Sequence, residues 1–172
     1  MSLNANDFEL FGLTPGFVQD RAELETRWKD LQREAHPDKF SSQGTAAQRI
    51  AMQWSVRINE GYQRLKDPLK RAAYLCELHG APINAENNTA MPAAFLMHQM
   101  QWREDLDDAE TTQDLEKISL DCSRFKAELL KDIEQLLDVR KDYPAAAAQV
   151  RALMFVERFA SDVEHRLDQI EQ

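Results

Sequence analysis

Four consecutive residues, His36-Pro37-Asp38-Lys39, place an imidazole, a carboxylate and an ammonium group around a proline. Proline fixes its own φ and disfavours helical conformation at the residue before it, so a helix that arrives at His36 must end there. The imidazole and the carboxylate are therefore presented on a turn. Such a turn could be the tip of a binding surface, a proton-transferring part of a catalytic site, or only a helix stop.

Two helices are predicted on either side of this turn. Asp20 and Glu23 form an N-terminal capping pair, and apolar residues then recur at helical spacing up to the proline, which gives a helix of about 15 residues. These residues are Leu24, Trp28, Leu31 and Ala35. After a loop over residues 40–44, a second capping pair, Thr45 and Gln48, begins another helix. Its stripe consists of Ala47, Ile50, Ala51, Trp54, Ile58 and Leu65. The second helix should return antiparallel to the first.

Shorter segments accompany this hairpin. Asp67-Pro68 breaks the chain, and a short helix is predicted over residues 69–79, with Gly80 as its stop. Its inward residues are Ala72, Leu75 and Cys76. A short helix or turn at the N-terminus could cover the hairpin with Phe8, Leu10, Phe11 and Leu13.

The second half of the chain predicts a helical bundle. Residues 81–91 carry no apolar period and are interpreted as a linker, so we expect a domain boundary there. Helical patterns follow at about 92–109, 112–143 and 145–171, and their short connections favour an antiparallel three-helix bundle. The stripe of the middle helix is Ile118, Cys122, Phe125, Leu129, Ile133 and Leu136. That of the last helix is Val156, Phe159, Ala160, Val163, Leu167 and Ile170.

The net charge of −9 is unevenly distributed over the 172 residues. Residues 1–80 carry 11 basic and 11 acidic side chains, whereas residues 81–172 carry 10 and 19. An acidic half disfavours nucleic acid as a partner, because phosphates require a basic surface, and it favours a partner with a basic face. The alternative is that the acidic surface serves only solubility.

Cellular location and redox state follow from two further features. No apolar run approaches the roughly 20 residues that a membrane span needs, and no basic start precedes an apolar stretch, so we expect a cytoplasmic protein. Cys76 and Cys122 lie far apart within helical patterns. Buried, reduced thiols are therefore expected rather than a disulfide or a metal site.

The first predicted helix has a basic side opposite its apolar stripe. Lys29 and Arg33 lie on this side and lead to Lys39 beyond the turn, although Asp30 and Glu34 dilute the charge. Such a stripe could meet an acidic groove on a partner, or it could be an ordinary solvated helix face.

The hairpin and its turn resemble the J-domain of DnaJ-type co-chaperones over roughly residues 7–80. The turn alone is a short match, but the flanking helices are in the expected register and a second motif follows. J-domains usually carry Tyr where this chain has Ala35, and Ala where it has Gly61; a helical glycine costs about 1 kcal/mol relative to alanine. The matching segments are Leu31-Gln32-Arg33, His36-Pro37-Asp38-Lys39, Ile58-Asn59-Glu60-Gly61-Tyr62, and Leu65-Lys66-Asp67-Pro68 with Arg71 and Tyr74.

This resemblance implies that the turn and the basic helix side bind a DnaK-type chaperone and stimulate its ATP hydrolysis. The hydrolysis itself takes place in the chaperone, and the J-domain contributes binding energy to the hydrolysing conformation rather than an acid or a base. The implied chaperone-binding residues are His36, Pro37, Asp38, Lys39, Arg33, Lys29 and Arg27.

The helix predicted over residues 92–109 has a second apolar face. Its core stripe, within about 40° of Phe95, consists of Trp102, Leu106 and Ala109. The second face, roughly 100–220° away, consists of Leu96, Met97, Met100, Glu104 and Asp108. On the last helix, Phe155 is likewise about 100° from the core stripe. Surplus apolar residues, methionines above all, suit a docking surface, although this face could instead pack on the first domain.

With its N-terminal hairpin, an acidic bundle containing Phe95-Leu96-Met97 followed by Arg103-Glu104 resembles the HscB family, the co-chaperones of iron–sulfur cluster assembly, over the whole chain. The resemblance implies that the bundle binds the scaffold protein IscU and delivers it to the DnaK-type chaperone HscA, whose ATP hydrolysis promotes cluster transfer. Gln101 and His98 stand where relatives often carry acidic residues, which reduces the electrostatic share of binding. The implied scaffold-binding residues are Leu96, Met97, Met100, Gln101, Glu104, Asp108 and Phe155.

The expected protein is therefore all-α, with a J-domain over residues 1–80, a linker over 81–91 and a three-helix scaffold-binding domain over 92–172. We expect a monomeric co-chaperone without cofactor, metal, nucleic acid or membrane partner. An enzyme using His36 and Asp38 is disfavoured because no nucleophile and no glycine-rich phosphate loop accompany them. The four histidines lie on separate elements without a Cys-x-x-Cys pair, which disfavours a metal site. A different client for the bundle, or its self-association, remains open.

Overall fold

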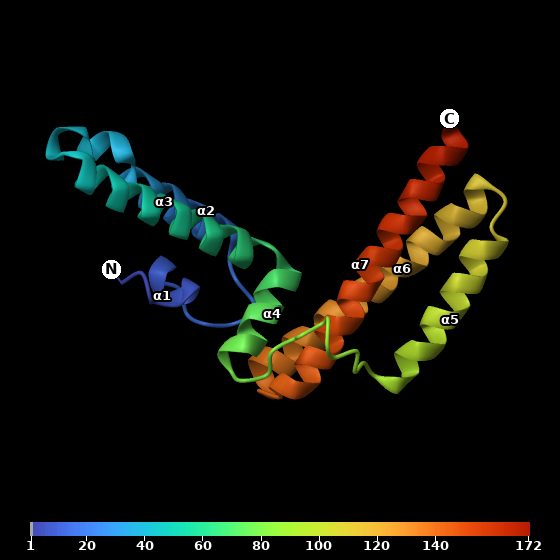
Figure 1. Cartoon of the computed structure of the whole chain (residues 1–172). Coiled ribbons are helices and arrows are strands. Elements are labelled where there is room, and N and C mark those ends of the chain that lie inside the picture. Colours follow the sequence, from blue (N-terminus) through green and yellow to red (C-terminus); the bar gives the residue numbers. More distant parts are fainter. Residues whose placement is uncertain (1) are drawn as a thin grey trace. The chain divides into compact units, whose positions relative to one another are not determined.

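The computed structural model describes residues 2–172 as helices joined by turns and loops (Figure 1). The contacts divide the chain into two units, Met1–Leu75 and Cys76–Gln172. This division lies a few residues before the boundary expected at residue 80, and the domain limits 1–80, 81–91 and 92–172 stay predictions. In chain order the helices are α1 (Asp7–Phe11), α2 (Arg21–Ala35), η1 (Pro37–Gln43), α3 (Thr45–Lys66), α4 (Pro68–Leu78), α5 (Ala93–Asp108), α6 (Thr112–Glu134), η2 (Gln135–Val139) and α7 (Tyr143–Glu171).

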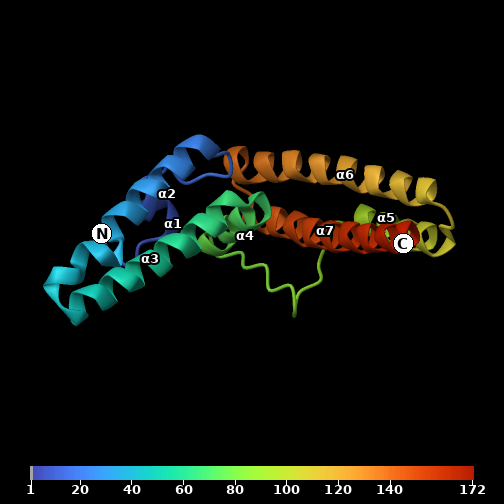
Figure 2. The same cartoon turned by 90° about the horizontal axis from the view of Figure 1, so that it is seen from above.

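The first unit is built on the hairpin of α2 and α3, which lie side by side in both views (Figures 1 and 2). Trp28 of α2 stacks on Tyr62 of α3 with ring centroids 4.3 Å apart and 11° between the planes. Asn59 Oδ1 accepts hydrogen bonds from Trp28 Nε1 at 3.1 Å and from Gln32 Nε2 at 2.6 Å. These contacts fix the antiparallel register of the two helices.

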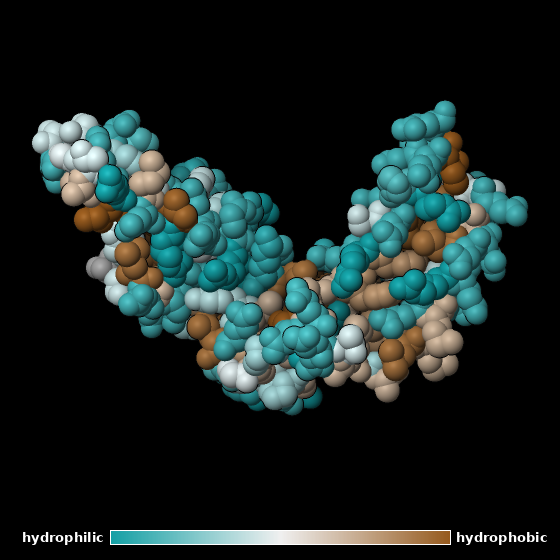
Figure 3. Space-filling model, viewed as in Figure 1, coloured by the Kyte–Doolittle hydropathy of each residue, from teal (hydrophilic) through white to brown (hydrophobic). Residues whose placement is uncertain are grey.

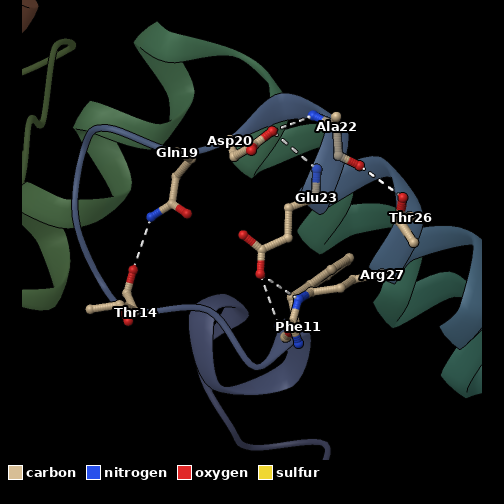
Figure 4. Close-up of polar contacts among 8 residues, drawn as sticks. All are labelled: Phe11, Thr14, Gln19, Asp20, Ala22, Glu23, Thr26 and Arg27. Atoms are coloured by element: carbon tan, nitrogen blue, oxygen red, sulfur yellow. Dashed lines mark hydrogen bonds and ion pairs between the residues drawn. The ribbon is translucent and has the colours of Figure 1, made fainter.

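The predicted start of α2 is confirmed. The Asp20 side chain accepts hydrogen bonds from the backbone N–H groups of Ala22 and Glu23, which satisfies two free donors of the first turn (Figure 4). Glu23 does not complete a capping box; its carboxylate pairs instead with Arg27 at 2.9 Å. Arg27 also donates to the carbonyl oxygen of Phe11 at 3.1 Å and thereby ties α1 to α2 (Figure 4).

The predicted start of α3 is wrong in its capping. Gly44, with φ 95°, is the residue at the N-cap and no side chain caps the helix, while Thr45 is already the first helical residue. The loop expected over residues 40–44 is mostly a 3₁₀ helix. Ile50, predicted to lie in the core stripe, is 55% exposed, because α1 does not extend to the tip of the hairpin.

A buried ion cluster holds α1 against α3. Asp7 is fully buried, and its two carboxylate oxygens lie 2.7 Å from the guanidinium of Arg57 and 2.9 Å from that of Arg64. The Asp7 backbone N–H donates to the Tyr74 hydroxyl of α4 at 2.9 Å. The cluster leaves little room on α3: a Cβ on the buried Gly61 would lie 3.0 Å from Phe11 and 3.2 Å from Arg57. The glycine that departs from the J-domain pattern therefore lies where α1 packs closely on α3.

The second unit contains the predicted antiparallel bundle of α5, α6 and α7 (Figures 1 and 2). Thr111 and Asp114 form a capping box at the start of α6, and the hydrogen bond from the Glu110 backbone N–H, with those of Thr111, holds the pKa of Asp114 below its usual value. The helix expected up to residue 143 ends earlier: α6 passes into the π-helical turn η2. Ile170, predicted to face the core, is 43% exposed.

Residues 82–90 are attached to the bundle. Arg151 of α7 is 8% exposed and donates to the carbonyl oxygens of Ile83 at 2.9 Å, Ala90 at 3.1 Å and Pro82 at 3.4 Å. The Ile83 side chain is buried as well. The segment interpreted as a linker is thus fixed to α7 at both of its ends.

Candidate functional site

His36 ends α2 because its backbone is extended, with φ −63° and ψ 129°, and Pro37 then begins the 3₁₀ helix η1. The imidazole Nδ1 accepts a hydrogen bond from the backbone N–H of Asp38 at 3.2 Å. In the neutral ring the proton must then be on Nε2, which is available as a donor. The Asp38 carboxylate lies 3.6 Å from Nδ1 and its side chain is 92% exposed. The turn therefore presents one donor and one carboxylate to solvent, on a backbone fixed by the proline.

The basic side of α2 leads to this turn, as the sequence predicts. The side chains of Lys29 and Arg33 are 60% and 71% exposed, and each pairs with an acidic residue of its own helix, Glu25 at 3.0 Å and Asp30 at 3.5 Å. The hydrogen bond from the Lys29 ammonium holds the pKa of Glu25 below its usual value. Such solvated pairs contribute little stability and are readily exchanged for a partner's charges. Arg27 differs, since its guanidinium is engaged with Phe11 inside the first unit.

Beside the turn lies an apolar groove of about 510 Å³ that the sequence did not predict. Its floor is formed by Ala51 and Ile58, which are 3% and 0% exposed, and its walls by Phe40, Ala47, Ile50 and Trp54. Brown surface follows the edge of the hairpin near its tip (Figure 3). The sequence signal for this groove was the set of apolar residues near the start of α3, which were predicted to lie in the core.

On the second unit, the outward face of α5 carries three exposed apolar side chains. Leu96, Met97 and Met100 are 51%, 76% and 68% exposed. Brown and tan surface covers the first half of α5 (Figure 3). We call these three residues the α5 patch. Their exposure agrees with the second face predicted from the helical spacing.

A polar border follows the α5 patch along α5. Gln101, Glu104 and Asp108 are exposed on the same helix, and the Gln101 side-chain amide donates to Asp105 at 2.9 Å. His98 turns away from this border: its ring lies 4.7 Å from that of Phe125 on α6. The border is therefore acidic toward the end of α5.

An aromatic cluster beneath the α5 patch fixes its position. Phe95, 3% exposed, contacts Phe125, Trp102 and Phe155 with ring centroids 5.4, 6.2 and 5.7 Å apart. Phe155 of α7 is half-buried, and the guanidinium of Arg103 lies 5.7 Å from its ring centroid. Phe155 therefore lies against Phe95 and Arg103 of α5, and its part in a scaffold site stays a prediction.

Metal-ligand clusters and cysteine thiols are two further kinds of possible functional group. Among residues 2–172 there is no group of three or more His, Cys, Asp or Glu side chains that could hold a metal ion. Cys76 and Cys122 are free and buried, and burial raises the pKa of each thiol to about 11. Thiols of this kind are poor nucleophiles at neutral pH. Within the described part of the chain, no helix has the length and apolarity to cross a membrane.

The chain has a helical hairpin with an exposed His-Pro-Asp turn at its tip, and a helical bundle follows the hairpin. This combination defines the class of J-domain co-chaperones. Comparisons with known proteins agree. The family model described as the HSCB C-terminal oligomerisation domain matches residues 91–164. A curated protein of Burkholderia multivorans, named co-chaperone protein HscB homolog, is 44% identical over 99% of both chains. One of Paraburkholderia xenovorans with the same name is 42% identical over 99% of this chain and 98% of its own length.

Solved structures give the same result. The chaperone HscB from Vibrio cholerae matches with a TM-score of 0.82 and 34% identity, covering 96% of this chain and 99% of its own. The human co-chaperone protein HscB matches with a TM-score of 0.85 and 25% identity, covering 99% and 84%. The chain belongs to the HscB family of J-domain co-chaperones, which confirms the resemblance and the all-α fold.

Proposed function

We propose that this co-chaperone stimulates ATP hydrolysis by the DnaK-type chaperone HscA and delivers the scaffold protein IscU to it, which promotes cluster transfer to iron–sulfur proteins. The chain itself catalyses no reaction and needs no cofactor in this proposal. It acts in the cytoplasm as a monomer.

The observation that carries the proposal is the pairing of two exposed surfaces of different chemistry on one chain. The first unit offers the polar turn at His36 and Asp38 beside the solvated cations Lys29, Arg33 and Lys39. The second unit offers the apolar α5 patch with its acidic border. A surface of the first kind suits an acidic site on the chaperone, and one of the second kind suits an apolar site on a client with a basic rim.

Two linked binding events then raise the concentration of the scaffold near the chaperone. If HscA binds the turn while IscU is held by the α5 patch, the scaffold meets the chaperone as part of one assembly rather than by a separate collision. The turn acts by binding more tightly to the chaperone conformation that hydrolyses ATP, and so shifts the population toward it.

The experiment is a steady-state ATPase titration of HscA with this protein, in the presence and absence of IscU. Stimulation by the protein alone, and a larger effect when IscU is present, are expected. If the protein leaves the hydrolysis rate unchanged at every concentration, the chaperone assignment is wrong. If IscU adds nothing and does not bind the protein by calorimetry, the client assignment is wrong while the chaperone assignment stands.

A second use of the bundle is favoured by one observation. The family model that matches residues 91–164 carries oligomerisation in its description, and the α5 patch could contact another copy of the chain. Light scattering separates the two uses, because self-association gives a mass that rises with protein concentration. That rise should disappear when Leu96 and Met97 are replaced by polar residues.

A further inference from the structure

The groove beside the His36 turn reaches the hydrophobic core of the first unit, because buried core residues form its base. The apolar stripe of α3 continues past the end of α1 to the tip of the hairpin, where α2 and the short helix η1 pack on it but leave part of it open. Ile50 is consequently 55% exposed, while its neighbours at the floor, Ala51 and Ile58, are 3% and 0% exposed. When another apolar group covers such an exposed apolar surface, water is displaced and the free energy of the system falls.

The groove is continuous with the turn that carries the proposed chaperone contact. Its lining includes Ala35, the residue directly before His36, and Phe40, the residue directly after Lys39. The turn and the groove are therefore two parts of one surface. Any protein that contacts the His36 imidazole and the Asp38 carboxylate from the tip lies within reach of the groove.

Charge at the rim indicates what accompanies an apolar occupant. Glu34 lines the groove with an exposed carboxylate, and no ion pair of Glu34 occurs among residues 2–172. Glu34 is thus the carboxylate of the groove lining, and the exposed carboxylate of Asp38 lies on the adjoining turn. At this rim a basic side chain beside an aliphatic one complements the Glu34 carboxylate, whereas the acidic site of the chaperone is met by the exposed cations Lys29 and Arg33 of α2.

We propose that the groove formed by Phe40, Ala47, Ile50 and Trp54 is a second binding subsite for the DnaK-type chaperone, and that it takes an aliphatic side chain of the chaperone with a basic side chain next to it. This inference rests on the proposed function, because it deepens the same contact. The polar turn orients the chaperone and the groove supplies apolar binding energy.

Ile50→Glu is the test, with Met52→Glu as its matched control. Both residues lie on α3 and are almost equally exposed, at 55% and 56%, but Met52 points to the opposite side of the helix and does not line the groove. In ATPase titrations of the chaperone, Ile50→Glu should raise the concentration for half-maximal stimulation about tenfold, as expected when one aliphatic contact is lost. Met52→Glu should change this concentration less than about twofold.

A direct readout of the groove accompanies the titration. Ile50→Cys and Met52→Cys are each labelled with a polarity-sensitive dye, since the natural thiols at Cys76 and Cys122 are buried. Adding the ATP-bound chaperone should shift the emission of the dye at residue 50 to the blue and leave that at residue 52 unchanged. Glu34→Gln should raise the half-maximal concentration about threefold at low salt, and this difference should shrink as salt is added.

Several outcomes overturn the proposal. Wild-type stimulation by Ile50→Glu, or equal losses for the two glutamate variants, would mean that the groove makes no contact with the chaperone. A shift of the dye with the scaffold alone, or with an unlabelled second copy of this chain alone, would assign the groove to that occupant instead. Because the wild-type protein and His36→Gln are measured in the same titration, failure of this subsite is distinguished from failure of the whole chaperone contact.

Discussion

The Nδ1 atom of His36 accepts a hydrogen bond from the backbone N–H of Asp38 at 3.2 Å. This bond fixes the ring on the turn and leaves Nε2 as the outward donor. His36→Gln replaces the rigid ring with a flexible amide that cannot hold both positions. We expect it to abolish stimulation of HscA in a steady-state ATPase assay.

Stability serves as the control for this variant. The His36 side chain is 57% exposed, so the substitution should change the free energy of unfolding by less than about 0.5 kcal/mol. Undiminished stimulation by a folded His36→Gln protein would contradict the role of the turn.

The α5 patch predicts a selective loss of scaffold binding. Alanine at Leu96, Met97 and Phe155 together removes much of the apolar contact area, so calorimetry with IscU should detect no binding. Stimulation of the chaperone by the protein alone should persist, because the His36 turn is unchanged.

Leu120→Ala provides the matched control, since Leu120 of α6 is 52% exposed but lies outside the α5 patch. It should leave the affinity for IscU unchanged. Unchanged affinity for the triple variant would rule out the patch as the scaffold site.

The buried carboxylate of Asp7 predicts a large stability effect. Asp7→Ala leaves the guanidinium groups of Arg57 and Arg64 without their partner, and breaking a buried pair in this way costs about 3 kcal/mol. The comparison is Asp20→Ala, which removes only the cap of α2 and should cost about 1 kcal/mol. Both values follow from urea unfolding monitored by circular dichroism. Equal costs would mean that the ion cluster contributes no more than an ordinary cap.

The two buried thiols make stability depend on alkaline pH. Burial raises the pKa of Cys76 and Cys122 to about 11 in the folded protein, whereas unfolded thiols titrate near 9. As the pH rises, the thiols of the unfolded state therefore lose their protons before those of the folded state. The free energy of unfolding is unaffected by this difference below pH 9, and it falls as the pH rises from 9 toward 11. By pH 10 the loss should be roughly 1 kcal/mol for each thiol.

The measurement compares urea unfolding of the wild-type protein with that of a Cys76→Ala, Cys122→Ala double variant at pH 7.5 and pH 10. Removing the thiols costs core packing at both pH values, but only the wild type should show the additional loss at pH 10. Parallel losses in the two proteins would contradict the raised pKa values.

Local patterns were enough to predict much of this fold. The spacing of Leu24 and Trp28 with the cap at Asp20 placed α2, and the position of Met97 relative to Phe95 placed the α5 patch on an outward face. These features depend on helical geometry and on neighbours within a few residues. The HscB resemblance, carried by short motifs in both halves, was confirmed by full-length relatives.

Features that depend on distant contacts could not be predicted in this way. The groove exists because α1 ends before it reaches Ile50, and the capping pattern at Thr45 was misinterpreted because Gly44 can adopt a φ of 95° without a side-chain cap. No local signal distinguishes Asp7, whose two partners on α3 are 50 or more residues away in the sequence. Arg151 also gave no signal, since its three acceptors are backbone carbonyls.

The Arg151 guanidinium has a consequence for how this protein tolerates changes of length. By binding the carbonyls of Ile83 and Ala90, it fixes both ends of a short exposed loop. The entropic cost of closing such a loop grows only slowly with the number of residues in it. Doubling the length of that loop costs only about 0.6 kcal/mol. Insertions between Asn84 and Thr89 are therefore inexpensive, whereas one residue added next to Ile83 or Ala90 would displace a carbonyl from its donor.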